Sequence, residues 1–538
     1  AGIQAITLND HYVDSAARDK ADKTASDYYP IVPYYSDREV RDWGYGLVLE
    51  GRGSTRFPKA IDDGPKHQVW EVADKKDGDD TVRFFLEMGN GLTLEKLFRY
   101  DPDRRDLALD IKLKNTGGEG LPASYRIALR GVQIWNPSSE HLLGNPASVY
   151  AGVTDAEGEA VAMVLGAADA NAVLWSKQEG GTFEFAGTTN RFFGGFLYPD
   201  PSLATGGSAV QQAMNLVETR HWPSTTFLQG GEEISAGSVP EVLCNMDLQV
   251  PTKGQTTTLS FRMFLGPKSS ATFAEQFDYE RFGLVMDTDL TPVCCCIPGI
   301  SNLARGLVWL LTAFHGVVGN WGVAIIMLTL LVRVLLSPIN FNMQRTMRIH
   351  GEKMAKLKPQ LDALNKRYKD DPKQLQAEMM KFNKEHQLLT APLKGCLPMF
   401  LTMPIWFGLF TALRVMYELR GAPFVGYIQD LSRPDMLAEL GIPFVPYFNL
   451  LPILMVGLWL YLQMGTPLPK DPQQRQMMVM MRFMPIMMGV MLYSYASGLM
   501  IYMCTSSVWG IVEQKVTKKI LGPVNPDAAG GMPNVPMV

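Results

Sequence analysis

Met327 to Ile339 reads MLTLLVRVLLSPI, an apolar run that suits a lipid bilayer except for Arg333 in its middle. Together with the apolar residues before it, the run is near the roughly 20 residues that a helix needs to cross a membrane. Moving a guanidinium into lipid costs about 2.5–3.5 kcal/mol even on the mild insertion scale. The stretch therefore predicts a membrane-spanning helix, and its arginine needs an explanation.

Two interpretations of Arg333 compete. In one, the side chain lies near the end of its helix, shortly before Pro338, and reaches the lipid headgroups along its apolar stem. In the other, it faces a wet cavity between helices. Thr329, Arg333 and Ser337 are spaced i, i+4, i+8 and share one helix face. Headgroup contact alone requires no polar stripe, so the spacing favours the cavity.

Later apolar runs supply further polar groups: Thr402, Ser497, Tyr502 and Ser506. Each alone is weak evidence, since a Ser or Thr in a membrane helix usually bonds its own backbone. No acidic residue of these runs stands near enough in sequence to be an obvious partner of Arg333. A positive site without its own counter-charge can accept one from another molecule.

Five candidate spans are predicted from residue 318 onward. They cover about Val318–Pro338, Cys396–Tyr417, Tyr447–Met464, and two segments of MMVMMRFMPIMMGVMLYSYASGLMIYMCTSSVWGIVEQ that meet near Ala496–Gly498. The preceding segment, 297–317, is amphipathic and is expected to lie in the membrane interface.

The loop charges predict an orientation. Residues 340–391 carry eleven Lys and Arg, whereas 418–446 carry only Arg420 and Arg433. By the positive-inside rule, 340–391, the 465–476 loop and the C-terminus are cytoplasmic, and five spans then put the N-terminal half outside. Within 340–391, apolar residues at helical spacing on both sides of KDDPKQ predict a helical hairpin, with Asp371 capping its second helix and Pro372 in the first position.

The N-terminal half, 1–290, predicts β structure. LALDIKLKNTG (107–117), ASYRIALRGVQIW (123–135) and TTTLSFRMFLGP (256–267) alternate apolar and polar residues and are separated by turn-forming residues. A large antiparallel sandwich is expected. The chain begins AGIQAITLND without an apolar segment, which a processed or truncated start would explain.

Composition excludes several functions. With 50 basic and 54 acidic side chains in 538 residues, the net charge of -4 does not indicate a nucleic-acid-binding protein. The six cysteines include Cys294, Cys295 and Cys296 but form no CxxC pair, and the seven histidines form no metal motif. We find no catalytic constellation, so neither an enzyme nor a metal or other cofactor is predicted.

Four stretches, in order, closely resemble the YidC-type membrane protein insertases of the YidC/Oxa/Alb family. They are GNWGVAIIMLTLLVR (Gly319–Arg333), GCLPMFLTMPIW (Gly395–Trp406), LRGAPFVGYIQDLSRPD (Leu419–Asp435) and SGLMIY (Ser497–Tyr502). The resemblance covers about residues 297–520. It implies a mixed fold: a periplasmic β-supersandwich over 1–290, an interfacial helix over 297–317, a five-helix membrane domain over 318–520 with the cytoplasmic hairpin 340–391, and a disordered tail over 521–538.

The resemblance also implies a function. Such a protein sits in the bacterial inner membrane and inserts nascent membrane proteins and helps them fold, alone or beside the Sec translocon. In the family, one arginine lies in a hydrophilic groove, and Arg333 occupies the matching position. Thr329, Thr402, Ser497 and Tyr502 match positions along that groove, and Ser337 extends the stripe of Arg333.

Departures from the family pattern qualify these expectations. The family usually has an N-terminal membrane anchor, which the printed chain lacks. Ala496 stands where proline is common, and Met503 where a second aromatic is common. The tail after residue 520 is not basic, which argues against a ribosome contact through it. Two other classes stay open: a transporter or channel, although no inverted repeat is evident, and an envelope sugar-binding scaffold built on the β domain.

The charge pattern generates a topology prediction. A cysteine introduced at Lys366 should react with membrane-impermeant reagents only from the cytoplasmic side, because residues 340–391 are expected inside. Labelling is measured in intact cells and in inverted vesicles. Labelling from outside intact cells would overturn the predicted orientation.

Overall fold

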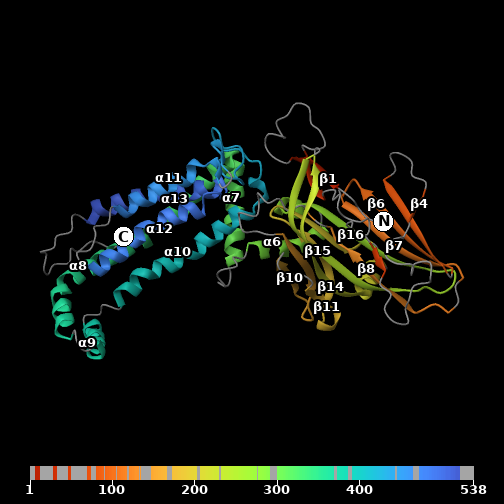
Figure 1. Cartoon of the computed structure of the whole chain (residues 1–538), viewed down its shortest axis with the longest axis horizontal. Coiled ribbons are helices and arrows are strands. Elements are labelled where there is room, and N and C mark those ends of the chain that lie inside the picture. The colour runs from red at the N-terminus through yellow and green to blue at the C-terminus, as the bar shows by residue number, and fades with distance from the viewer. Residues whose placement is uncertain are drawn as a thin grey trace. The chain divides into compact units, whose positions relative to one another are not determined.

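A computed structural model describes much of the chain (Figure 1). The described residues are 6–12, 28–32, 47–49, 70–73, 80–89, 91–104, 106–117, 120–132, 134, 147–166, 172–202, 206–229, 232–274, 277–290, 300–368, 372–385, 390–442, 445–464 and 472–521. The Cys294–Cys296 triplet and the tail beyond Leu521 lie outside them. The chain divides into two compact units: Ala1–Thr291 with Val415–Gly421, and Pro292–Arg414 with Ala422–Val538.

The first unit is built on two antiparallel sheets. The larger has the strand order β10-β9-β12-β13-β16-β7-β6-β5-β4, and the smaller β11-β14-β15-β8-β3. Their bounds are β3 Leu47–Leu49, β4 Glu71–Val72, β5 Thr81–Gly89, β6 Leu92–Asp101, β7 Asp106–Asn115, β8 Ser124–Arg130, β9 Ser148–Thr154, β10 Ala160–Gly166, β11 Val173–Ser176, β12 Thr182–Thr189, β13 Phe193–Pro199, β14 Met214–Gln229, β15 Glu232–Gln249 and β16 Thr256–Pro267. A separate pair joins β1 Ile6–Tyr12 and β2 Tyr28–Val32.

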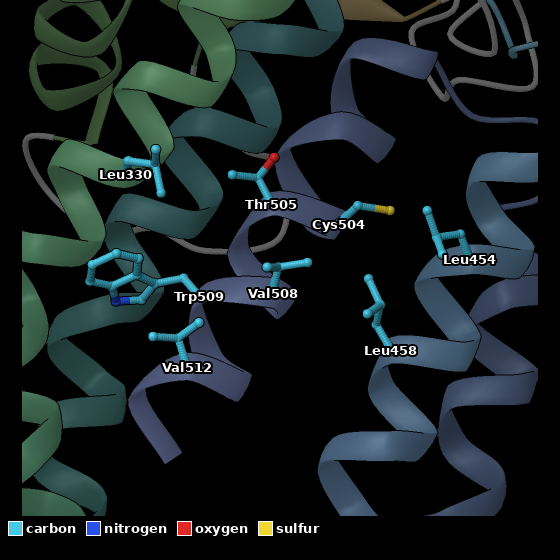
Figure 2. Close-up of a pocket in the computed structure, with 8 residues that line it drawn as sticks. All are labelled: Leu330, Leu454, Leu458, Cys504, Thr505, Val508, Trp509 and Val512. Carbon is cyan, nitrogen blue, oxygen red and sulfur yellow. The ribbon is translucent and has the colours of Figure 1, made fainter. Parts of the chain in front are cut away.

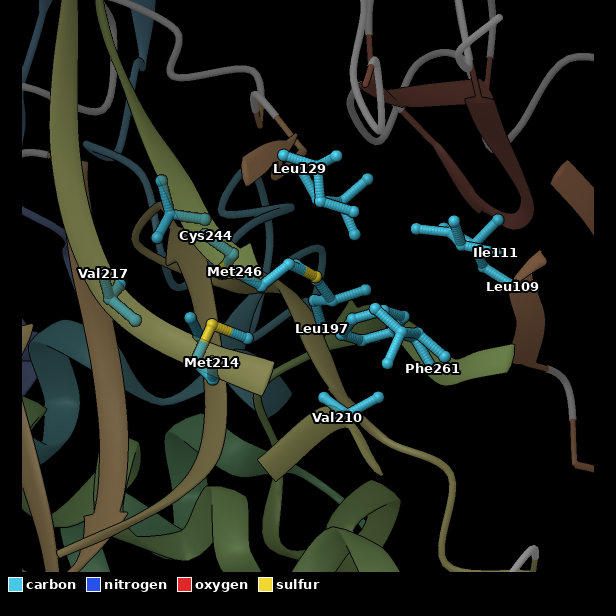
Figure 3. Packing of buried hydrophobic residues seen from close by; sticks show 14 of the residues in the cluster. Leu109, Ile111, Leu129, Leu197, Val210, Met214, Val217, Cys244, Met246 and Phe261 are labelled. Atoms are coloured by element: carbon cyan, nitrogen blue, oxygen red, sulfur yellow. The ribbon is translucent and has the colours of Figure 1, made fainter. Parts of the chain in front are cut away.

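The core of this unit lies between the sheets. Leu109 and Ile111 of β7 and Phe261 of β16 come from the larger sheet, and Leu129 of β8 and Met246 of β15 come from the smaller; all belong to one buried cluster (Figure 3). Alternate residues of a strand point to opposite faces, so the apolar alternation in the sequence becomes one apolar face per sheet. The predicted β-sandwich is thus confirmed.

Lys96 is a charged residue at a position of β6 where the alternating pattern places an apolar side chain. It lies on the inward face between Leu94 and Phe98 and is fully buried. Its ammonium group lies 5.7 Å from the ring centre of Trp70 and 5.2 Å from that of Phe98. Burial disfavours the charged form and lowers the pKa of Lys96 to about 7.

The described part of the second unit is mainly helical. Its helices are α7 Ile300–Val318, α8 Trp321–Arg367, α9 Pro372–Glu385, α10 Thr390–Val415, α11 Leu450–Met464, α12 Pro472–Met491 and α13 Ser497–Leu521, and a small hairpin pairs β17 Ala438–Ile442 with β18 Val445–Phe448. Helix α7 buries Ile300, Ala304, Leu307 and Leu311 on one face, as an amphipathic helix does. Helix α9 begins at Pro372, as predicted for the second arm of the hairpin.

The boundary expected between the first span and the hairpin is absent. Helix α8 runs without a break through Pro338 and Pro359, so the span and the first hairpin arm are one helix of 47 residues. A proline in a helix removes one backbone hydrogen bond, but the rest of the ladder can continue past it.

The count of five spans is not confirmed. Among the described residues, Trp321–Thr346 is the one helical segment long and apolar enough to cross a membrane. Met403–Val415, Leu450–Met464 and Arg482–Met491 are shorter apolar helices. Fifteen residues of α11 rise about 22 Å, which is less than the roughly 30 Å of a typical hydrocarbon core.

Burial of Lys96 predicts a pH dependence of stability. An exposed lysine in the unfolded chain titrates near pH ~10.4, so between pH 7 and 9 the unfolded state binds more protons than the folded state. The free energy of unfolding of the first unit should therefore rise with pH, by about 2 kcal/mol across this range. Urea titration of the detergent-solubilised protein, read out by proteolysis of the first unit, measures it.

The Lys96→Met variant should lose most of this pH dependence, because the titrating group is gone. Lys114→Met, at an exposed position of β7, is the matched control and should keep it. Equal pH dependence in the parent and in Lys96→Met would show that another group is responsible.

Candidate functional site

Arg333 lies on α8 in a contact with α13. Its guanidinium donates a hydrogen bond from Nη2 to Oγ of Ser506. Tyr502, one turn before Ser506, is buried and lies within electrostatic range of Arg333. The structure therefore brings three polar residues of the two helices together, and two of them, Arg333 and Tyr502, were predicted as site residues.

Of the other predicted site residues, Thr329 and Ser337 lie on α8 with Arg333, whereas Thr402 lies on α10. Thr329 is buried on the same face of α8, but its hydroxyl donates to the carbonyl of Ile325 at 2.7 Å, the backbone bond expected of an isolated threonine. Ser337 is half-buried one turn after Arg333. The side chain of Thr402 lies outside the described residues.

Ser497 is held away from this contact by another set of bonds. Its hydroxyl donates to the carbonyl of Asp430 at 3.0 Å, and its backbone N–H donates to the carbonyl of Arg433 at 2.7 Å. These bonds attach the first turn of α13 to the 422–435 loop. The structure thus gives Ser497 a role in positioning the helix.

Two polar residues near Arg333 were missed. Asn340 is buried two turns further along α8, and its side chain hydrogen-bonds the carboxylate of Glu513 on α13. Glu513 also lies within electrostatic range of Arg333. Arg333 and Glu513 are 180 positions apart in the sequence, so Glu513 was not an obvious partner there. The signal that was available is the spacing, because Asn340 follows Arg333 by seven residues and Glu513 follows Ser506 by seven.

One loop, 422–435, holds the starts of three helices. Asn320 caps α8 by accepting from the N–H of Val323 at 3.1 Å, and its amide donates to the carbonyl of Phe424 at 3.1 Å. The carboxylate of Asp435 accepts from the N–H groups of Leu450 and Leu451 at the start of α11, at 2.7 and 3.1 Å. Together with the hydrogen bonds of Ser497 at the start of α13, these contacts join the loop to the starts of α8, α11 and α13. At a helix start the first N–H groups need acceptors outside the helix.

An apolar cavity lies beside the contact of α8 with α13. It has a volume of 310 Å³, and Figure 2 shows side chains of three helices around it. The lining residues are Leu330 of α8, Leu454 and Leu458 of α11, and Cys504, Thr505, Val508, Trp509 and Val512 of α13. This mostly apolar lining suits an aliphatic group.

Comparison with known proteins bears on the helical unit. Residues 313–523 match the family model described as 60Kd inner membrane protein. The membrane protein insertase YidC of Stenotrophomonas maltophilia (strain K279a) is 33% identical over 270 residues, which cover 48% of this chain and 41% of that relative. The YidC of Pelobacter propionicus is 34% identical over 272 residues, covering 50% and 46%. The resemblance to the YidC-type insertases is confirmed.

The match to YidC-type insertases covers only part of each protein. The chain spans about half the length of the curated relatives that it matches. A solved structure described as an active YidC insertase with its first transmembrane domain resolved aligns over 84% of this chain and 85% of its own, with 17% identity and a TM-score of 0.32. The stretch matched by the family model, 313–523, includes Arg333, Ser506 and Glu513.

The contacts of the 422–435 loop with three helix starts generate a stability prediction. Asp435→Ala removes the acceptor of Leu450, Leu451 and Tyr427, so the free energy of unfolding should fall by about 1–2 kcal/mol, the usual cost of a lost helix cap. Asp435→Asn keeps one acceptor oxygen and should lose less. Thermal unfolding of the purified protein in detergent measures both.

Glu439→Ala, in the exposed strand β17, is the control and should unfold with the parent. If Asp435→Ala also unfolds with the parent, the loop does not stabilise the helix starts as described.

Proposed function

We propose that this chain is a membrane protein insertase and folding helper of the bacterial inner membrane, and that Arg333 attracts the polar tail of an incoming substrate. The observation that carries the proposal is the position of Arg333. It lies on an apolar helix, within the stretch shared with YidC-type relatives, beside buried polar groups of a second helix. A charge on an apolar membrane helix is costly, and a binding role explains why it is present.

In the proposed mechanism, charge attraction acts on the substrate tail. A positive site part-way into the bilayer shortens the apolar distance that a hydrophilic tail must cross. Carboxylates of the tail are drawn to Arg333, and the Coulomb attraction is larger there than in water because the local dielectric constant is lower. On the α13 side, Ser506 accepts a hydrogen bond from the guanidinium, and Tyr502 lies one turn away within electrostatic range.

Hydrophobic transfer completes the reaction. The substrate's apolar helix moves along α8 and α13 into lipid, driven by removal of its apolar surface from water. The apolar cavity between α8, α11 and α13 supports this path, since it offers aliphatic contacts close to Arg333. No nucleotide hydrolysis is needed for this step.

The proposal includes the surroundings of the protein. The β unit is periplasmic, and the C-terminus and the arm around α9 are cytoplasmic; the distribution of Lys and Arg supports this orientation. Nascent membrane proteins are the substrates, and the Sec translocon is a partner for some of them.

Insertion of one substrate carrying an acidic, neutral or basic tail tests the proposal. Arg333→Ala should reduce insertion of the acidic-tailed substrate most, by roughly tenfold if about 1.4 kcal/mol of charge attraction is lost. Arg333→Lys should keep substantial activity, although lysine loses the planar fork. Arg333→Glu should fail on the acidic tail and partly recover on the basic one. Protease protection of the tail in cells depleted of their own insertase measures insertion.

If Arg333→Ala inserts each of the three substrates as well as the parent does, the charge mechanism is wrong. Arg333 would then be an interfacial anchor, whose removal is harmless or stabilising because a costly buried charge is gone.

A further inference from the structure

Two polar contacts join α8 and α13 in the same register. Arg333 donates to Ser506, and seven residues later on each helix Asn340 contacts Glu513. Seven residues make nearly two full turns and advance about 10.5 Å along a helix. The equal spacing shows that the two helices run in the same direction at this contact, with both pairs on one seam. Glu513 therefore lies on the seam that holds Arg333.

The carboxylate of Glu513 is incompletely satisfied. Its Oε1 atom is buried and accepts no hydrogen bond among the described residues, while the side chain of Asn340 contacts the carboxylate. Asn340 is a neutral partner, and the charged group that acts on Glu513 is Arg333. The carboxylate and the guanidinium lie on the same seam about two helical turns apart, and opposite charges so placed attract each other.

We propose that Glu513 is a resident counter-charge of Arg333, and that a substrate's acidic tail must outweigh it. The inference rests on the proposed function, since it concerns the same positive site. Between substrates, the carboxylate lowers the cost of keeping a guanidinium among apolar helices. During insertion it reduces the attraction for a weakly acidic tail and the repulsion of a basic one. Glu513 is thus a specificity-determining residue, and Asn340 positions it.

The magnitude follows from the spacing. Two unit charges about 10 Å apart, at an effective dielectric constant of about 20, change an equilibrium constant by roughly three- to tenfold once partial screening is included. That is large enough to set how many carboxylates a substrate tail needs. It is small enough for two or three tail carboxylates to overcome.

The Glu513→Gln variant tests the proposal, because glutamine keeps the shape and the contact with Asn340 but not the charge. Insertion is measured for one substrate whose tail carries one aspartate, no charge or one lysine, at equal membrane levels of each variant. The ratio of aspartate-tail to lysine-tail insertion should rise roughly three- to tenfold over the parent. Glu439→Gln makes the same charge change on the exposed strand β17 and should leave the ratio unchanged. An unchanged ratio in Glu513→Gln would overturn the proposal.

A double variant separates action through Arg333 from direct action on the tail. In the Arg333→Ala background, Glu513→Gln should no longer change the ratio, because the charge that it offsets is absent. An equal change in both backgrounds would overturn the counter-charge role. The Arg333→Ala arm alone reports on the proposed function: if the aspartate preference survives there, that function fails, whatever Glu513 does.

A second variant guards against loss of folding. Asn340→Asp adds a negative charge beside Glu513 and should lower the aspartate-to-lysine ratio below that of the parent. If Glu513→Gln fails to accumulate in membranes, this opposite shift carries the test, and an unchanged ratio in Asn340→Asp overturns the proposal.

Discussion

The helical unit depends on how the unpaired N–H groups at its helix starts are satisfied. The first N–H groups of a helix have no partner within the helix, and here protein atoms supply the acceptors. The 422–435 loop does this for α11 through Asp435 and fixes α8 and α13 through Asn320 and Ser497. Three helix starts held by one loop have a fixed relative height, and that height decides which residues of α8 and α13 meet further along.

The Arg333 seam follows from this arrangement. With both helices held at the same end, Arg333 lies level with Ser506, and Asn340 lies level with Glu513. A shift of one helix by a single residue would rotate its polar stripe by about 100° and separate the pairs. The polar bonds of the loop and the ionic groups on the seam therefore belong to one structural unit, although Glu513 follows the end of the loop by 78 residues in sequence.

Part of this was predictable from sequence. Apolar alternation predicted the β-sandwich, and the stripe of Thr329, Arg333 and Ser337 located the charged face of α8. The sheet order was not predictable, since alternation does not say which strands pair. The continuity of α8 through Pro338 was not predicted, and Glu513 was missed because its link to Arg333 needs the register between two distant helices. Ser497 was assigned to the site as a polar residue of an apolar run and by resemblance, whereas its hydrogen bonds go to the 422–435 loop.

The continuity of α8 has a mechanical consequence. A helix of 47 residues is about 70 Å long, and it joins the apolar segment that carries Arg333 to the charged arm that ends at Arg367. Because a helix resists twisting far more than a loop does, a rotation of the arm about its axis is transmitted toward the guanidinium as torque. Pro338 and Pro359 each omit one hydrogen bond of the ladder and are the points where bending concentrates. The charged arm and the arginine are therefore two parts of one continuous helix, so a movement of the arm is passed on to the segment that carries Arg333.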